Sequence, residues 1–249
     1  MSSMAAPAPG PVLVPGEPGA GGYHSRWDSS SPDGPVAEHI EMQYAGMEHQ
    51  ADTATSGMWL FLATELLFFG ALFFIYAVNR SAHPAGTAEG SRHAELWIGT
   101  VNTVLLLTSS AVFAWGVGCA RQGRNRAVFW ASVATGGLGT VFFLLKLYEW
   151  KEDLDKSMFP GTGFALSGHP DAGGAELFWC FYWVGTGLHL VHMAFGLGLV
   201  AWIALSARRL RFSEGYSTPV EVVGLYWSFV DMVWLVLYPT IYLAGRAGS

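Results

Sequence analysis

Four side chains that could carry proton or metal chemistry lie inside long apolar stretches of this sequence. They are two acids, Glu65 and Asp231, and two histidines, His189 and His192. The histidines are three residues apart, so on a helix they share a face and could both reach one metal ion or haem iron. An ionisable group is costly against lipid, and we therefore expect all four to point into a protein interior.

Metal binding and hydrogen bonding are alternative roles for the two histidines. Two histidines on one helix need further ligands from facing helices to complete a site. Glu65 and Asp231 are the candidates, and they are too few to complete a site. We therefore predict no metal site, and we expect the histidines to form contacts within the helix interface. For Glu65 the alternatives are a proton-relay carboxylate and a packing residue that hydrogen-bonds a histidine or backbone group, and we favour the second.

Five apolar stretches are long enough to position these groups as membrane-spanning helices, each of which needs about 20 residues. Of the 249 residues, 51% are apolar and 13% are charged, whereas about a quarter are charged in a soluble domain. The net charge of −6 argues against a nucleic-acid partner. We predict an all-α bundle of five transmembrane helices at approximately 57–78, 96–120, 126–150, 176–206 and 221–245.

The predicted depths of the ionisable groups suggest one internal cluster. At 1.5 Å per residue, Glu65 lies about 12 Å above the inner end of its helix, and Asp231 and His192 lie about 15 and 18 Å above theirs. Gly185 and Gly196 share the stripe of the two histidines, which predicts close approach of a second backbone. We therefore expect Glu65, His189, His192 and Asp231 to form a polar cluster with a structural or proton-related role.

Other polar residues are predicted to support the helix interfaces. Lys146 and Glu149 are three residues apart at the outer end of the third helix, where they can pair and extend to the membrane boundary. Asn102, Ser109 and Ser110 are expected to hydrogen-bond across helices.

Aromatic residues, one proline and two cysteines have predicted structural roles. Pro239 is expected to bend the last turns of its helix, and Cys119 and Cys180 are interpreted as small core residues. The aromatic packing and interface residues of the last helix are Trp227, Trp234, Tyr238 and Tyr242.

The remaining segments predict the domain organisation and topology. Residues 1–37 are predicted to be a flexible tail, residues 38–54 a polar lead-in with a short surface helix, and residues 55–246 the membrane domain. Arginines gather in the loops after the second and fourth spans, so the positive-inside rule predicts a cytoplasmic N-terminus and an external C-terminus. These arginines are Arg121, Arg124, Arg126, Arg208, Arg209 and Arg211.

The sequence carries no phosphate-binding loop, nucleophile elbow, dinucleotide fingerprint or metal-binding cysteine pattern. A complex subunit and a small proton-coupled transporter are both compatible with the residues described so far. We find no internal repeat that would support the transporter.

Five motifs give the chain a specific resemblance. They are TELLFFGALFF (64–74), NTVLLLTSS (102–110), FLLKLYEW (143–150), TGLHLVHMAFGL (186–197) and YWSFVDMVWLVLYPTIYL (226–243). In order and spacing, they resemble subunit III of haem–copper oxidases, including cytochrome c oxidase, in its short five-helix bacterial form. The resemblance covers roughly residues 55–245.

The resemblance implies a non-catalytic inner-membrane subunit of a proton-pumping oxidase that reduces oxygen to water. It implies packing on oxidase subunit I, with subunit II nearby, no cofactor in this chain, haem and copper in its partners, and bound phospholipid. The intramembrane acid of the family maps onto Glu65, its histidines onto His189 and His192, and its last-helix aspartate onto Asp231.

Two positions depart from the usual family pattern. Ser228 replaces a histidine and Lys146 replaces an uncharged residue, which suggests an outlying branch. Quinol oxidase subunit III and the accessory subunit of nitric oxide reductase share the fold and many of the motifs, so both remain alternatives.

Overall fold

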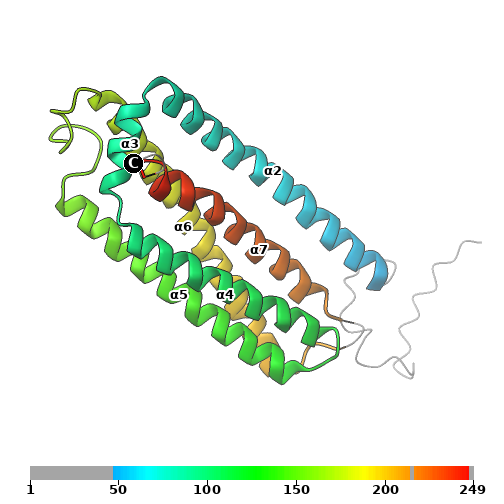
Figure 1. Ribbon diagram of the computed structural model, residues 1–249. Coiled ribbons are helices and arrows are strands. Elements are labelled where there is room, and N and C mark those ends of the chain that lie inside the picture. The colour runs from blue at the N-terminus through cyan, green and yellow to red at the C-terminus, as the bar shows by residue number, and fades with distance from the viewer. Residues whose placement is uncertain (1–46, 214–215, 247–249) are drawn as a thin grey trace, which may run out of the picture. The chain divides into compact units, whose positions relative to one another are not determined.

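A computed structural model describes residues 47–213 and 216–246, with side chains from residue 51 onward (Figure 1). Within these residues the fold is all-α and contains no extended strand. Five helices in the described part of the chain are long and apolar enough to cross a membrane, which agrees with the predicted number. The elements are α2 (Met47–Ala82), α3 (Pro84–His93), α4 (Leu96–Ala120), α5 (Asn125–Asp155), α6 (Ala172–Arg208), α7 (Thr218–Tyr238) and the π-helical turn η1 (Pro239–Leu243).

The N-terminal part of the domain differs from the predicted boundaries. The predicted tail, residues 1–37, lies outside the described residues, as does most of the predicted lead-in. Residues 47–54 form the first turns of α2 instead of a separate surface helix. The short helix α3, which has Pro84 in its first turn, was not predicted, because its ten residues are mostly small and polar.

The last predicted helix is divided at Pro239, where we predicted a bend. Proline has no N–H to donate, so the α-helical pattern ends at Tyr238 and a π-helical turn follows. The Ser91 hydroxyl of α3 donates to the Ile241 carbonyl at 2.6 Å and thereby ties this turn to α3. As a result, Tyr242 points into the bundle and is fully buried.

Helix α7 is central in the bundle and α2 is peripheral. In the most apolar window of each span, 56% is buried for the α7 span but only 11% for α2. Figure 1 shows α2 along one side, with α7 between it and the α4–α5 pair, and α2 packs against both α6 and α7. Most of the apolar surface of α2 therefore remains available to lipid or to another subunit.

The glycine stripe of α6 receives side chains of α7 instead of a second backbone. A Cβ atom on Gly196 would lie 3.2 Å from the Trp227 ring, and one on Gly139 of α5 would lie 2.8 Å from the same ring. A Cβ on Gly185 would lie 3.2 Å from Leu237. The expectation of close backbone approach was therefore wrong here, because the indole of Trp227 fills the space that the glycines leave.

The two cysteines differ in their environment. Cys119 of α4 is buried, as predicted, whereas Cys180 of α6 is exposed. Three residues before Cys180, Leu177 is also exposed. This face of α6 therefore points away from the core, and the prediction of a buried Cys180 was wrong.

Asp171 joins α3 to the start of α6. Its carboxylate accepts hydrogen bonds from the backbone N–H groups of Gly86, at 2.9 Å, and Gly174, at 3.3 Å, and lies 2.9 Å from His83 Nδ1. The Gly86 N–H and the other two donors hold the pKa of this carboxyl below its usual value. Asp171 is therefore the N-cap of α6 and the anchor of α3.

Replacing Gly86 with alanine is expected to destabilise the contact between α3 and α6. The new Cβ would lie 2.5 Å from the Asp171 carbonyl oxygen and 2.6 Å from the Ala175 backbone nitrogen, neither of which can rotate away. We expect a loss of about 1–3 kcal/mol, the usual cost of overpacking, measured as a lower unfolding temperature in detergent. Gly173→Ala is the control, because a Cβ there meets nothing within 4 Å.

Candidate functional site

Glu65 of α2 and His192 of α6 contact each other, as an ion pair or as a hydrogen-bonded pair. Glu65 Oε2 lies 3.1 Å from His192 Nε2. Their side chains are 19% and 18% exposed, so the pair is at the edge of the bundle and not at its centre. An acid and an imidazole from two separate spans therefore contact each other.

Hydrogen-bond geometry indicates how many protons this pair holds. His192 Nδ1 lies 2.8 Å from the Leu188 carbonyl oxygen, which can only accept, so Nδ1 carries a hydrogen. The contact between Nε2 and Glu65 needs one further hydrogen, either on Nε2 or on the carboxyl group. In addition to the hydrogen on Nδ1, one hydrogen therefore lies between Glu65 and His192 Nε2, whichever of the two groups carries it.

Two aromatic residues contact His192 beside its pairing with Glu65. The Phe69 ring lies edge-on to the imidazole, with ring centres 5.3 Å apart. The Tyr226 hydroxyl of α7 donates to the His192 backbone carbonyl at 3.0 Å. The site is thus built where α2, α6 and α7 meet.

His189 and Asp231 lie apart from this pair. The His189 ring is fully buried between Phe142 and Trp234, with ring centres 5.6 and 5.1 Å away, and neither ring nitrogen has a hydrogen-bond partner among the described residues. Asp231 is 5% exposed and has Ser110 of α4 as its polar neighbour. The structure brings together two of the four predicted residues.

In residues 47–213 and 216–246, no group of three or more histidine, cysteine, aspartate or glutamate side chains is arranged to hold a metal ion.

Lys146 and Glu149 form a fully buried ion pair, at 3.2 Å, deep inside the bundle. The two side chains pair as predicted, but protein covers them completely, so they do not extend to the surface as expected. Neighbouring helices cover the pair, and the hydroxyl groups of Tyr182 (α6) and Tyr242 (η1) accept hydrogen bonds from the ammonium group at 3.0 and 2.9 Å.

Sequence reasoning missed three members of this group: Asp153, Tyr182 and Tyr242. Asp153 follows Glu149 by four residues and is therefore on the same helix face, a signal that was available in the sequence. The Tyr182 hydroxyl contacts Asp153 Oδ2 and Glu149 Oε1. The two tyrosines come from α6 and η1, so only the packing of the helices identifies them.

The smaller polar residues have different surroundings. Ser109 contacts a neighbouring helix, since its hydroxyl accepts from the Trp227 indole at 3.2 Å. Asn102 is buried, and its amide has no hydrogen-bond partner in the described part of the chain. Ser228 lines two cavities of about 310 and 410 Å³.

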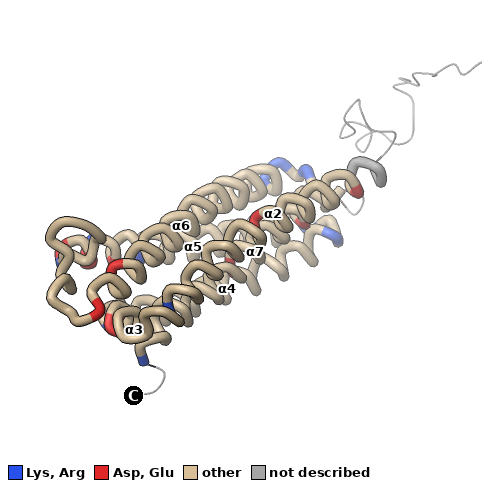
Figure 2. Tube along the Cα trace, turned by 90° about the horizontal axis from the view of Figure 1, so that it is seen from above, with Lys and Arg blue, Asp and Glu red and all other residues tan. Residues whose placement is uncertain are grey.

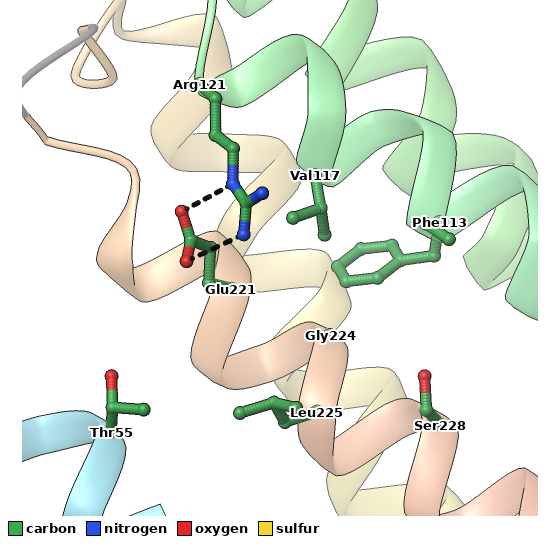
Figure 3. A pocket seen from close by; sticks show the side chains of 9 residues that line it. Thr55, Phe113, Val117, Arg121, Glu221, Gly224, Leu225 and Ser228 are labelled. Carbon is green, nitrogen blue, oxygen red and sulfur yellow. Dashed lines mark hydrogen bonds and ion pairs between the residues drawn. The ribbon is translucent and has the colours of Figure 1, made fainter.

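The first of these cavities is shown in Figure 3. Its mouth carries an ion pair in which Arg121 donates to Glu221 at 3.0 and 3.2 Å, and Glu221 raises the pKa of Arg121. Because Arg121 is largely exposed, this pair contributes little to stability. Phe113, Val117 and Leu225 make the remainder of the lining mainly apolar.

One end of the bundle carries both arginine-rich loops (Figure 2). Figure 2 shows lysine and arginine at the end that carries the α4–α5 turn and the C-terminal end of α6. The Asn125 amide at this end donates to the Phe212 carbonyl at 2.6 Å, which joins the two connections. The two arginine-rich loops therefore lie on the same side of the domain.

Comparisons with known proteins match most of the chain. The family described as cytochrome c oxidase subunit III matches residues 39–246. A protein named cytochrome c oxidase subunit 3 from Synechocystis sp. is 32% identical over 200 residues, which cover 80% of this chain and 78% of that protein.

Two further relatives bear on the assembly. A quinol oxidase subunit 3 from Bacillus subtilis is 27% identical over 215 residues, which cover 85% of this chain and 98% of that protein. A protein from Aeropyrum pernix named heme-copper oxidase subunit I+III is 30% identical over 205 residues, which cover 77% of this chain and 23% of that protein.

Proposed function

Because the chain belongs to the cytochrome c oxidase subunit III family, we propose that it is a cofactor-free membrane subunit of an aerobic terminal oxidase. The oxidase as a whole reduces oxygen to water and pumps protons, with haem and copper in its other subunits. This chain supports the catalytic subunit and proton uptake. The observation that carries the proposal is the family match over residues 39–246, which includes all five candidate spans.

Subunit I is the proposed main partner. The name of the Aeropyrum pernix relative joins subunits I and III in one chain, which supports their proximity. The peripheral helix α2 offers an apolar surface for such a contact, with Leu66, Leu67 and Phe74 between 61% and 76% exposed. Subunit II is expected nearby. Relatives named for cytochrome c and for quinol oxidases both support a role that does not depend on the electron donor.

The proposed location is a bacterial inner membrane, with the N-terminus in the cytoplasm and the C-terminus outside. The shared side of the two arginine-rich loops supports this orientation, because basic residues are retained in the cytoplasm. The membrane domain is proposed to cover residues 55–246, preceded by a lead-in and a tail.

A phospholipid chain is the proposed occupant of an apolar cavity beside α2. The cavity is about 410 Å³ and lies between α2 and α7. It is lined by Trp59, Leu62, Ala63, Leu66, Leu225, Ser228, Phe229 and Met232. This lining suits a saturated hydrocarbon segment, which needs no hydrogen-bond partner.

Purification in mild detergent tests the proposed function. We expect the chain to migrate with a subunit that shows haem and copper by absorption spectroscopy and metal analysis. A stable, haem-free oligomer of this chain alone would contradict the proposal and support a small transporter. Migration with a nitric oxide reductase would support the accessory-subunit alternative.

Glu65 is proposed to stabilise the helix interface through His192, which is the structural alternative to a proton-related role. We expect Glu65→Gln to assemble like the wild type, because an amide N–H can donate to Nε2. Glu65→Leu leaves the imidazole nitrogen without a partner in a partly buried site, at a cost of about 1–2 kcal/mol. It should therefore reduce the yield of assembled oxidase.

The yield of the purified complex and its oxygen consumption per haem measure these effects. If the Gln and Leu variants both assemble and turn over like the wild type, the contact between Glu65 and His192 has no role in assembly. Thr64→Val is a suitable neighbour control, because the Thr64 hydroxyl donates only within α2, to Phe61 at 2.7 Å.

A further inference from the structure

The buried group around Lys146 has a fixed number of hydrogen-bond donors. The Lys146 ammonium has three hydrogens, and its partners are Glu149 at 3.2 Å and the hydroxyl oxygens of Tyr182 and Tyr242. Each tyrosine can then donate one hydrogen. Tyr242 uses its hydrogen for Glu149 Oε1, at 2.7 Å.

Tyr182 has one hydrogen for two acidic oxygens. Its hydroxyl oxygen is within hydrogen-bond distance of Asp153 Oδ2 and lies 3.2 Å from Glu149 Oε1. If both carboxyl groups were ionised, one of these contacts would bring two oxygen atoms together with no hydrogen between them. The geometry therefore requires one more hydrogen than the lysine and the tyrosines supply.

The net charge of the group also favours one additional proton. One ammonium and two carboxylates would leave a net charge of −1 in a group whose members are all buried. An unbalanced charge is costly in a low-dielectric interior. One additional proton makes the group neutral.

The contacts indicate which carboxyl group holds this proton. Glu149 contacts the Lys146 ammonium directly, so its negative charge is compensated. Asp153 Oδ1 and Glu149 Oε2 are both buried without a hydrogen-bond partner among the described residues, but only Glu149 Oε2 lies within ion-pair distance of the ammonium, at 3.2 Å. An unpaired oxygen is less costly as the carbonyl of a neutral acid than as half of a carboxylate.

We propose that Asp153 is a proton-binding site, in which its neutral carboxylic acid donates to Tyr182, Tyr182 donates to Glu149, and Glu149 is paired with Lys146. The bound ligand is one proton, at a site that shares no residue with the contact between Glu65 and His192. This site goes beyond the proposed oxidase role, and it does not depend on which oxidase the chain serves.

The other titratable groups that face Asp153 add no second buried cation. Tyr182 faces it from α6, Tyr242 completes the group from η1, and Lys156 follows it in the next turn. The Lys156 ammonium is partly exposed and donates to Glu95 at 2.7 Å, so its charge is already compensated. Lys146 is therefore the cation that the buried carboxyl groups share.

Infrared spectroscopy of the chain, purified with the subunits that accompany it, tests the proposal. Protonated carboxyl groups absorb at a higher frequency than carboxylates, and carbon-13 labelling of aspartate shifts the bands of aspartic acid alone. We expect the wild type to show a protonated aspartic acid band at neutral pH that Asp153→Asn lacks. Glu152→Gln is the control, because Glu152 accepts from exposed Tyr148 outside this group.

Two further variants test the charge balance if Asp153→Asn does not assemble. Lys146→Met removes the cation, so a second protonated carboxyl band, from Glu149, should appear. Glu149→Gln removes one acid, so Asp153 should ionise and lose its band. The proposal would be overturned by identical aspartic acid bands in the wild type and Asp153→Asn, by no second band in Lys146→Met, or by persistence of the Asp153 band in Glu149→Gln.

Discussion

Replacing Glu149 with leucine is expected to lower the free energy of unfolding by about 3–5 kcal/mol, the usual cost of removing one partner of a buried ion pair. Lys146 would remain fully buried without its carboxylate contact at 3.2 Å. The Tyr242 hydroxyl would lose its acceptor at 2.7 Å. Ionisation of Asp153 can restore the charge balance, but it does not restore the direct contact with the ammonium.

Reversible unfolding in mixed detergent micelles, followed by tryptophan fluorescence, measures this loss. Glu149→Gln should cost less than Glu149→Leu, because its single amide oxygen can keep one of the two contacts, accepting either from the ammonium or from Tyr242. Glu152→Leu is the matched control on the same helix, because its hydrogen bond with Tyr148 is at the surface, and a change within about 0.5 kcal/mol is expected there. Equal stability of Glu149→Leu and the wild type would show that Lys146 does not need a carboxylate partner.

Replacing Trp234 with alanine is the second large destabilisation that we expect. Its fully buried indole packs edge-on against Phe142, with ring centres 4.8 Å apart, and beside His189, at 5.1 Å. Its N–H donates to the Thr103 hydroxyl of α4 at 3.0 Å. Loss of a buried tryptophan costs about 3–5 kcal/mol, and we expect the lower end because lipid also offers the unfolded chain apolar contacts.

The same unfolding assay measures this effect, with two comparisons. Trp234→Phe keeps part of the packing but loses the hydrogen bond to Thr103, so it should fall between alanine and the wild type. Trp97→Ala is the control, since Trp97 is 77% exposed. A loss at Trp234→Ala no greater than at Trp97→Ala would mean that this aromatic core does not support the bundle.

The fold class and the number of spans could be predicted from the sequence because both depend on the length and composition of single segments. A run of about 20 apolar residues satisfies its own backbone hydrogen bonds only as a helix when it crosses a bilayer. Motif order indicated the family for the same reason, since motifs are read along the chain. Helix α3 was missed because its polar sequence contains neither a long apolar run nor one of the five family motifs.

The candidate site was only partly predictable, because sequence spacing does not say which helix each face meets. His189 and His192 are three residues apart, which places their side chains about 60° apart around the helix axis. That difference sends His192 toward Glu65 on α2, whereas His189 enters the aromatic core beside Trp234. The two histidines do lie on neighbouring parts of the same face of α6, as predicted, but each part of that face packs against a different neighbour.

By itself, the sequence determined that five apolar helices would span a membrane and that Glu65 and the α6 histidines would lie within them. Only the tertiary structure decided that Lys146 and Glu149 are buried and not at the boundary, because Tyr182 and Tyr242 cover them from α6 and η1. Burial of a charge depends on the groups that surround it, and those groups come from distant parts of the chain.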